Sequence, residues 1–305
     1  MASGEWGLVL SGGGGKGAYQ VGAWRALCEL GLDSQLSGIS GVSVGAINAV
    51  LMACTNQIRA EIIWKAIDPL QFLDIDLSTI QDGIFSREGL TSLIQSNLDL
   101  IKVSNSELPI FVNTSQDEGG GHYVARYYQL NGMAPSRIMQ ILLASSALPV
   151  AYPSVVIDEQ HHLDGGLTNN VPVKPLYDMG LRKFLVIDVS AESQLIPQLY
   201  PEAEIVHVRP SRDIGRLLDG TLDFSGQGAA YRIELGYRDM LRTWNAYQAG
   251  ELNHPDFAKV AAIDAATDHQ QIRVDLMQKK YSDTVNARME KWDEMIKKLG
   301  IDPNA

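Results

Sequence analysis

A run of glycines that follows an apolar segment constrains the fold of this chain more than any other feature. The segment Trp6–Leu10 has the composition of a buried strand, and residues 12–17 are all glycine except Lys16. Apolar side chains then recur at helical spacing over residues 18–30. Glycine permits positive φ angles and leaves backbone N–H groups uncovered. The N-terminal segment therefore predicts a strand, a glycine loop and a helix, as at the start of a doubly wound α/β sheet.

A serine in a second glycine motif follows one helix later. Ser43 lies at the centre of the sequence GVSVG, between Gly41 and Gly45. In the pattern G-x-S-x-G, the serine occupies a sharp, strained turn between a strand and a helix, where its oxygen is exposed for nucleophilic attack. Residues 36–40 fit the strand and the apolar residues 44–55 fit the helix, whose N-terminus favours negative charge beside the serine. Glycine- and serine-rich turns without catalytic roles also occur in α/β proteins, so this motif alone leaves both interpretations open.

A carboxylate that precedes a glycine pair is the third candidate group. Asp164 is followed by Gly165 and Gly166, and residues 155–158 and 162–164 are predicted to pair as a hairpin across residues 159–161. An aspartate at such a strand end can accept the proton of a serine hydroxyl and return it to a leaving group. An aspartate before two glycines is also a common turn sequence.

Four segments in this order resemble the four sequence blocks of the patatin-like phospholipases: residues 11–17, 41–45, 144–149 and 164–172. The resemblance covers roughly residues 5–190. It implies a fold similar to that of cytosolic phospholipase A2, and a Ser–Asp dyad in place of a catalytic triad. The resemblance implies that Ser43 is the nucleophile and Asp164 the general base. It also implies an oxyanion hole formed by Gly12, Gly13 and Gly14, with the N–H groups of Gly13 and Gly14 as donors. Gly41, Gly45, Gly165 and Gly166 would support the conformation of the motifs.

The sequence departs from the family pattern in two small ways. Val42 and Val44 flank the serine where alanine is frequent in the family, and Gly15 adds a fourth consecutive glycine. Neither change removes a reactive group. Lys16 falls where the family usually carries Lys or Arg, and both a solvated loop lysine and contact with a lipid headgroup fit that position.

The expected fold class is α/β, a patatin-like three-layer sandwich with a mostly parallel central sheet and a helical C-terminal extension. We expect a catalytic domain over residues 5–228 and a helical extension over residues 229–305 that packs on the same domain. Residues 184–189 form a continuous apolar run, which is typical of a central parallel strand. Strands are also expected at residues 109–113 and 123–130, and helices at residues 137–148, 231–247 and 274–298.

Three alternatives to a dyad hydrolase each fit part of the sequence. Gly12, Gly14 and Gly17 satisfy the dinucleotide fingerprint G-x-G-x-x-G, but no acidic residue ends the second strand to hold a ribose. A Ser-His-Asp α/β-hydrolase would need a histidine after the aspartate, which leaves His207, His254 and His269. None of these lies near a catalytic signature. A catalytically silent binding protein with the same fold is the third alternative.

Composition agrees with a globular lipid acyl hydrolase, namely a phospholipase A, lysophospholipase or esterase. The formal net charge of −11 argues against nucleic-acid binding. No cofactor is expected, and no residues have metal-ligand spacing. The expected partner is a lipid or phospholipid substrate, with transient contact to a membrane surface; the sequence does not indicate an oligomeric state. Without a signal peptide or an apolar span, the expected location is the cytoplasm, and signal-free secretion stays open.

Overall fold

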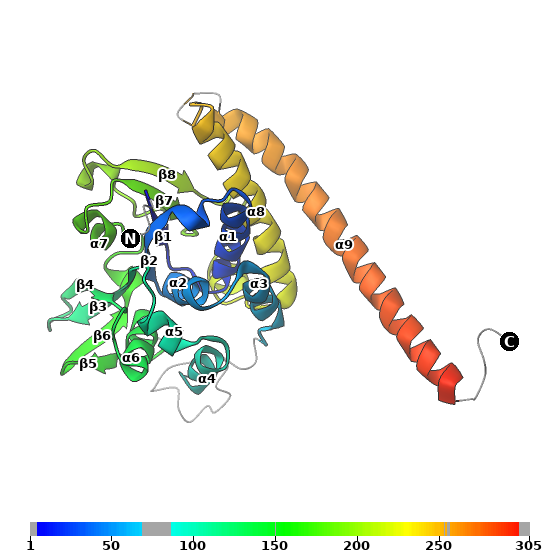
Figure 1. Cartoon of the computed structure of the whole chain (residues 1–305), viewed down its shortest axis with the longest axis horizontal. Helices are drawn as coiled ribbons and strands as arrows, with labels where there is room; N and C mark the ends of the chain where they lie inside the picture. The colour runs from blue at the N-terminus through cyan, green and yellow to red at the C-terminus, as the bar shows by residue number, and fades with distance from the viewer. Residues whose placement is uncertain (1–4, 69–86, 150, 253, 255–256, 299–305) are drawn as a thin grey trace.

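The computed structural model describes residues 5–68, 87–149, 151–252, 254 and 257–298. Within them the chain forms one eight-stranded sheet with helices packed around it (Figure 1). The strands are β1 (Trp6–Leu10), β2 (Leu36–Val42), β3 (Ile110–Asp117), β4 (Tyr123–Gln129), β5 (Val155–Ile157), β6 (Gln160–Asp164), β7 (Lys183–Ile187) and β8 (Glu204–Val208). The α-helices are α1 (Ala18–Glu29), α2 (Val44–Cys54), α3 (Gln57–Ala66), α4 (Arg87–Asn97), α5 (Leu100–Ser104), α6 (Pro135–Ser145), α7 (Lys174–Asp178), α8 (Gly226–Gln248) and α9 (Phe257–Lys298).

The centre of the sheet is parallel and one side of it is antiparallel. Strands β3, β2, β1, β7 and β8 lie side by side in that order, and every neighbouring pair among them is parallel. The hairpin β5–β6 and the strand β4 both pair with β3 in antiparallel fashion. As in other open parallel sheets, the loops that follow the carboxyl ends of β1 and β2 meet at one edge, which is where ligands bind in this class of fold.

Alternate residues of β1 enter two different cores. Leu8 and Leu10 belong to a large apolar cluster with side chains from α1, α2, α6 and α8. Val9 faces the other side, in a smaller cluster that includes Leu176 of α7. Because strand side chains alternate between the two faces, a strand that is apolar throughout must be covered on both sides. The sheet therefore lies between two layers of helices, which confirms the predicted three-layer α/β fold.

Most predicted elements are present, with differences at their ends. The hairpin β5–β6 forms, but it turns at Asp158 and Glu159, with φ angles of 50° and 64°, and not over residues 159–161. Helix α6 ends at Ser145, so residues 146–148 do not continue it as predicted. The last helix begins at Phe257, 17 residues before the predicted start at residue 274. The predicted extension also includes residues 299–305, which lie outside the described residues.

Helix α8 packs against α1 through a pair of glycines. A Cβ atom at Gly22 would lie 1.8 Å from the carbonyl oxygen of Ile233, and one at Gly236 would lie 2.0 Å from that of Tyr19. Both distances are far below van der Waals contact, so the two helix backbones touch at these points. The buried Tyr19 hydroxyl also donates a hydrogen bond to Asp239 of α8, at 3.1 Å. Glycine is thus required on both helices for this close approach.

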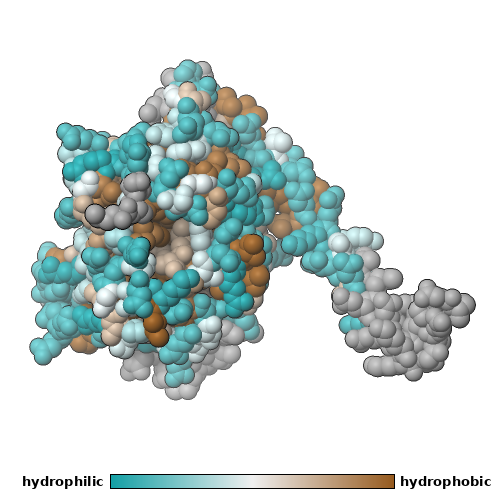
Figure 2. Space-filling model, viewed as in Figure 1, coloured by the Kyte–Doolittle hydropathy of each residue, from teal (hydrophilic) through white to brown (hydrophobic). Residues whose placement is uncertain are grey.

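Helix α9 runs past α8 and then away from the body of the molecule (Figure 1). Its Ala265 and Ile272 are buried, and Asp268 forms ion pairs with Arg238 and Arg242 of α8. Most of its other described side chains are exposed, and Figure 2 shows a largely hydrophilic surface along this helix. No helix among the described residues is long and apolar enough to cross a membrane.

The glycine contact between α1 and α8 generates a stability prediction. Gly22→Ala should lower the free energy of unfolding by about 1–3 kcal/mol, because the added methyl group forces the two helices apart. Urea unfolding monitored by circular dichroism measures the change. Asn245→Ala, on an exposed position of the same α8, is the matched control and should stay within about 0.5 kcal/mol of the parent. Equal stability of Gly22→Ala and the parent would contradict the close approach.

Candidate active site

Ser43 lies at the sharp turn between β2 and α2. Strand β2 ends at Val42 and the helix begins at Val44, which leaves Ser43 with φ 55° and ψ −126°. A positive φ at a residue other than glycine is a strained conformation that the surrounding structure must impose. The first turn of α2 points its unpaired N–H groups, and thus positive partial charge, toward this end of the helix. The structure therefore places Ser43 in the elbow that its sequence motif predicts.

The two glycines of the motif allow this turn. A Cβ atom at Gly41 would lie 2.3 Å from the carbonyl oxygen of Gly45, and one at Gly45 would lie 2.3 Å from that of Leu10. Helix α2 thus leaves the strand with its backbone in contact with both β2 and β1. Any side chain at either glycine would push the helix outward and change the conformation of Ser43.

Ser145 and Asn113 hold the turn at Ser43 through hydrogen bonds. The Ser43 N–H donates to Ser145 Oγ at 2.8 Å, and Ser145 Oγ donates to the carbonyl oxygen of Asn113 at 2.7 Å. The buried side chain of Asn113 in turn donates to the carbonyl oxygens of Gly165 and Asn169, at 2.9 and 2.7 Å. These bonds join the end of α6, β3 and the loop after β6 to the serine. The segment at residues 144–149 therefore contributes to the site by holding the backbone of Ser43 through Ser145.

Asp164 ends β6, and its carboxyl lies close enough to the side chain of Ser43 for that hydroxyl to lower its pKa. Its carboxylate is only 5% exposed, and Oδ1 accepts the Gly166 N–H at 2.8 Å. Burial raises the pKa of Asp164 to about 6, and the hydrogen bonds from Ser43 and Gly166 lower it by less than burial raises it. A Cβ atom at Gly165 would lie 2.3 Å from the carbonyl oxygen of Asn113, so the chain passes close to β3 here. The structure thus brings Ser43 and Asp164 together.

The glycine loop lies directly beside Ser43. A Cβ atom at Gly12 would lie 3.1 Å from Cβ of Ser43 and 2.6 Å from Oδ1 of Asn170. The Gly12 N–H donates to Asn170 Oδ1 at 3.2 Å, so it is already used. No described residue accepts a hydrogen bond from the N–H of Gly13 or Gly14, and Gly14 has φ 56°. Of the three predicted oxyanion donors, Gly13 and Gly14 therefore keep their N–H groups available for a ligand.

Asn170 connects the glycine loop to a buried polar network. Its Nδ2 donates to Ser190 Oγ at 2.8 Å, and that hydroxyl donates to Asp188 Oδ1 at 2.5 Å. Asp188 also pairs with His207 Nε2 at 3.2 Å. Burial alone would raise the pKa of Asp188, but hydrogen bonds from His207 and Ser190 hold that pKa well below its usual value. His207 therefore has a partner far along the network from Ser43.

Two of the three histidines that a triad could use, His207 and His269, are bonded to other groups. His207 binds Asp188, and His269 accepts or donates a hydrogen bond with the Tyr231 hydroxyl at 2.6 Å, where α8 meets α9. His162, which comes just before the aspartate, contacts Thr114 Oγ1 at 2.9 Å. Among the residues that the structure describes, no group of three or more His, Cys, Asp and Glu side chains could hold a metal ion.

Three residues at the site were not assigned a role from the sequence: Asn113, Ser145 and Asn170. Ser145 and Asn170 fall inside the recognised motif segments, so their positions were visible although their bonds were not. Asn113 follows an apolar strand segment and carries no local signal. Their partners lie between 20 and 158 residues away along the chain, and such contacts exist only in the folded chain.

Comparison with known proteins shows which protein family this chain resembles. The family model described as patatin-like phospholipase matches residues 8–177, more than half of the chain. Patatin-like phospholipase domain-containing protein 7 of Mus musculus is 28% identical over 194 residues, which cover 61% of this chain and 14% of that protein. Neuropathy target esterase sws of Drosophila melanogaster is 26% identical over 194 residues, which cover 61% of this chain and 13% of that protein. The chain thus spans less than a fifth of the length of these two relatives.

Among solved structures, VipD from Legionella pneumophila superposes with a TM-score of 0.46 and 14% sequence identity, over 98% of this chain and 81% of that one. The family match is the decisive comparison, because its boundaries contain the glycine loop, the elbow serine and the aspartate that the structure brings together. On that match, the chain belongs to the patatin-like phospholipase family.

Proposed function

We propose that this chain is a lipid acyl hydrolase that cleaves carboxylic esters with a Ser43–Asp164 dyad. The observation that carries the proposal is the proximity of the Ser43 side chain, on its strained turn, to the buried carboxyl of Asp164. A nucleophile within hydrogen-bond reach of a base is the minimum arrangement for covalent acyl transfer. Family membership supports the same chemistry, since the matching family is one of phospholipases.

In the first half of the proposed reaction, Ser43 Oγ attacks the ester carbonyl carbon while Asp164 accepts the hydroxyl proton. The carbonyl oxygen becomes an oxyanion, which the N–H groups of Gly13 and Gly14 stabilise with two hydrogen bonds. The tetrahedral intermediate then expels the alcohol part of the lipid, and Asp164 returns the proton to that leaving oxygen. Ser43 is left as an acyl ester.

In the second half, water takes the place of the departed alcohol. Asp164 removes a proton from the water as its oxygen attacks the acyl carbon, and the same glycine N–H groups hold the second oxyanion. Collapse of this intermediate breaks the bond to Ser43 Oγ, and Asp164 gives the proton back to the serine. A fatty acid is released and the enzyme regains its starting state.

The raised pKa of Asp164 suits both directions of proton transfer. With a pKa of about 6, the carboxylate is mostly ionised at neutral pH and can act as a base. It is also more basic than an ordinary exposed aspartate, because burial disfavours its charged form. A base with a pKa close to the working pH transfers protons in both directions more easily than one with a low pKa.

The proposed substrate class is a lipid ester, namely a phospholipid, a lysophospholipid or a related acyl ester. A relative from Mycosarcoma maydis is named lysophospholipase NTE1, and it is 24% identical to this chain over 206 residues. Transient contact with a membrane surface would give the enzyme access to such a substrate. We assign the proposed catalytic unit to residues 5–228, with residues 229–305 as a helical extension on it.

The first test of this function is removal of the nucleophile. Ser43→Ala should abolish turnover of a short-chain p-nitrophenyl ester and of lysophosphatidylcholine, while its circular dichroism spectrum stays native. An alkyl fluorophosphonate should modify the parent enzyme at Ser43, as read by peptide mass spectrometry. Ser34→Ala, an exposed serine outside the site, is the control and should keep full activity. Labelling at another serine, or activity retained by Ser43→Ala, would refute the assignment.

A second test addresses the base through the pH dependence of turnover. Because Asp164 must be ionised to accept a proton, kcat/KM should fall as pH drops through about 6, the pKa of Asp164. Asp164→Asn should lose about 10²–10⁴-fold of the activity at neutral pH, which is typical of a lost general base. His207→Gln, His254→Gln and His269→Gln should each stay within about tenfold of the parent. A histidine variant as inactive as Ser43→Ala would favour a triad instead.

A third test uses stability instead of activity. The folded pKa of Asp164 is raised above its value in the unfolded chain, so the native protein loses stability as pH rises from about 4 to about 6. Asp164→Asn removes this penalty, so its free energy of unfolding at pH 8 should exceed that of the parent by about 1–3 kcal/mol. The difference should shrink as pH is lowered toward 4. Urea unfolding at several pH values measures it, and a pH-independent difference would show that burial of the charge is not its cause.

A further inference from the structure

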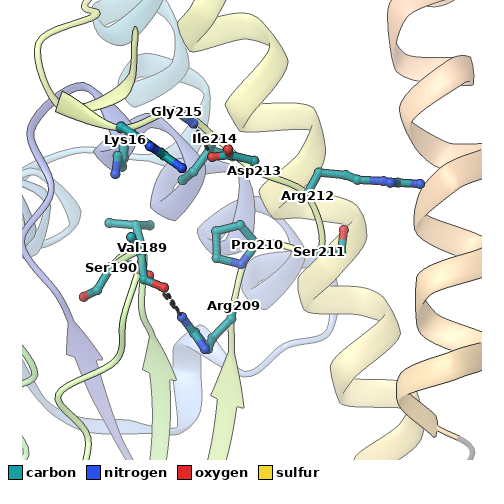
Figure 3. Close-up of a pocket in the computed structure, with 12 residues that line it drawn as sticks. Lys16, Val189, Ser190, Arg209, Pro210, Ser211, Arg212, Asp213, Ile214 and Gly215 are labelled. Carbon is teal, nitrogen blue, oxygen red and sulfur yellow. Dashed lines mark hydrogen bonds between the residues drawn. The ribbon is translucent and has the colours of Figure 1, made fainter. Parts of the chain in front are cut away.

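A cavity of about 410 Å³ lies behind the glycine loop, and the proposed reaction does not use it. Its walls are Lys16, residues 189–191 after β7, and residues 209–216 after β8 (Figure 3). The size is that of a small-molecule site. Four of these residues are cationic, namely Lys16, Arg209, Arg212 and Arg216, although the side chain of Arg212 points away from the cavity; Asp213 supplies a single carboxylate. This is a locally basic pocket on a chain whose net charge is −11.

Lys16 is buried here without a bonded partner among the described residues. The residue is only 6% exposed, and its ammonium group lines the cavity without a hydrogen bond or ion pair to any described residue. Burial lowers the pKa of Lys16, the field of Asp213 raises it, and that of Arg232 lowers it. An anion in the cavity would pair with this ammonium group through a charge-assisted hydrogen bond. Most of Lys16 is thus covered by the fold, while its ammonium group lies on the wall of the cavity.

The arginines of the pocket have different roles. Arg209 Nη2 donates to the carbonyl oxygens of Ser190 and Ala191, at 3.1 and 3.0 Å, which holds the guanidinium at the rim of the cavity. Its remaining N–H donors are available to a ligand. Arg212 instead points toward α9, where its Nε donates to the carbonyl oxygen of Ala265 at 3.4 Å (Figure 3). Lys16 and Arg209 are thus the two cations best placed for a bound anion.

We propose that this pocket binds the phosphate group of an anionic ligand, either a free phosphomonoester or the headgroup of a lipid. A guanidinium offers two parallel N–H donors to phosphate oxygens, and an ammonium adds a point charge that binds the same group. The cavity has room for a small organic part beside the phosphate. The carboxylate of Asp213, whose Oδ1 accepts the Gly215 N–H at 2.9 Å, lies on the same wall and weakens the attraction.

The pocket is coupled to the glycine loop through the backbone. The Lys16 N–H donates to the carbonyl oxygen of Gly13 at 3.2 Å, and a Cβ atom at Gly13 would lie 2.6 Å from Cγ2 of Val189 on the pocket wall. A phosphate that holds Lys16 would therefore also hold the loop that carries the proposed oxyanion donors. Only this effect on turnover rests on the proposed function; binding of the phosphate does not.

The binding test uses the Ser43→Ala protein, so that its result is independent of catalysis. Glycerol 3-phosphate is titrated at constant ionic strength, with sodium chloride as the replaced salt, and ³¹P NMR line width reports binding. Lys16→Gln in this background should weaken binding by at least about tenfold, as loss of a charge-assisted hydrogen bond does. Lys174→Gln, an exposed lysine of α7, and Arg212→Gln, which points away from the cavity, are matched controls that should bind within about twofold of the parent.

A second variant should change the affinity in the opposite direction. Asp213→Asn keeps the acceptor for Gly215 but removes the only carboxylate of the wall, so phosphate should bind roughly two- to tenfold more tightly. A gain in affinity cannot come from misfolding. If Lys16→Gln binds as well as the parent, or if Asp213→Asn does not bind more tightly, the pocket is not a phosphate site.

Vesicles distinguish the two sources of phosphate. The same proteins are sedimented with phosphatidylcholine vesicles that contain or lack phosphatidic acid, a lipid with a phosphomonoester headgroup. Lys16-dependent binding of glycerol 3-phosphate identifies a free ligand, and Lys16-dependent binding that occurs only with phosphatidic acid vesicles identifies a lipid headgroup. Absence of Lys16-dependent binding in both arms overturns the proposal.

Discussion

The contact of backbone with backbone at Gly41 and Gly45 is the constraint on which the rest of the site depends. Because neither residue has a side chain, α2 can leave β2 at a steep angle and touch the carbonyl oxygen of Leu10 on the neighbouring strand. This geometry forces Ser43 into a positive φ, with its hydroxyl at the carboxyl edge of the sheet. The network through Ser145 and Asn113 then holds the strained turn, since it bonds the Ser43 N–H that no helix or strand can satisfy.

In the proposed mechanism, burial of Asp164 both favours catalysis and lowers the stability of the folded protein. The hairpin β5–β6 and the turn at Gly165 bring the carboxylate under the elbow, where water is excluded and the pKa rises to about 6. The charged form is destabilised, which makes the group a better base and a less stable part of the folded protein. The hydrogen bonds from Ser43 and Gly166 offset only part of that penalty. Proposed reactivity and local instability are therefore two aspects of the same buried charge.

Local sequence predicted the parts of this structure that depend on local backbone geometry. The turn at Ser43, the glycine loop and the strand that ends at Asp164 each rest on residues within a few positions, so their motifs carried enough information. The contacts of Asn170 and Asn113 do not, because an asparagine after a strand or in a loop is compatible with many partners. The start of the last helix was also missed, since residues 257–273 are stabilised by Ala265 and Ile272 packing beside α8 and not by a strong local pattern. The surroundings of Lys16 could not be predicted from the local sequence either, because residues 209–216 come to lie beside it only in the folded chain.

The glycine loop has two faces that the sequence presents as one motif. On one face Gly12 lies beside Ser43, and the N–H groups of Gly13 and Gly14 are the proposed oxyanion donors. On the other face, Val189 fills the space beside Gly13 and the side chain of Lys16 enters the basic pocket. A loop made almost wholly of glycine has little rigidity of its own, because glycine loses the most conformational freedom when it is ordered. The loop must therefore take its shape from its neighbours: Asn170 fixes the Gly12 end, and the contacts of Lys16 and Val189 fix the other.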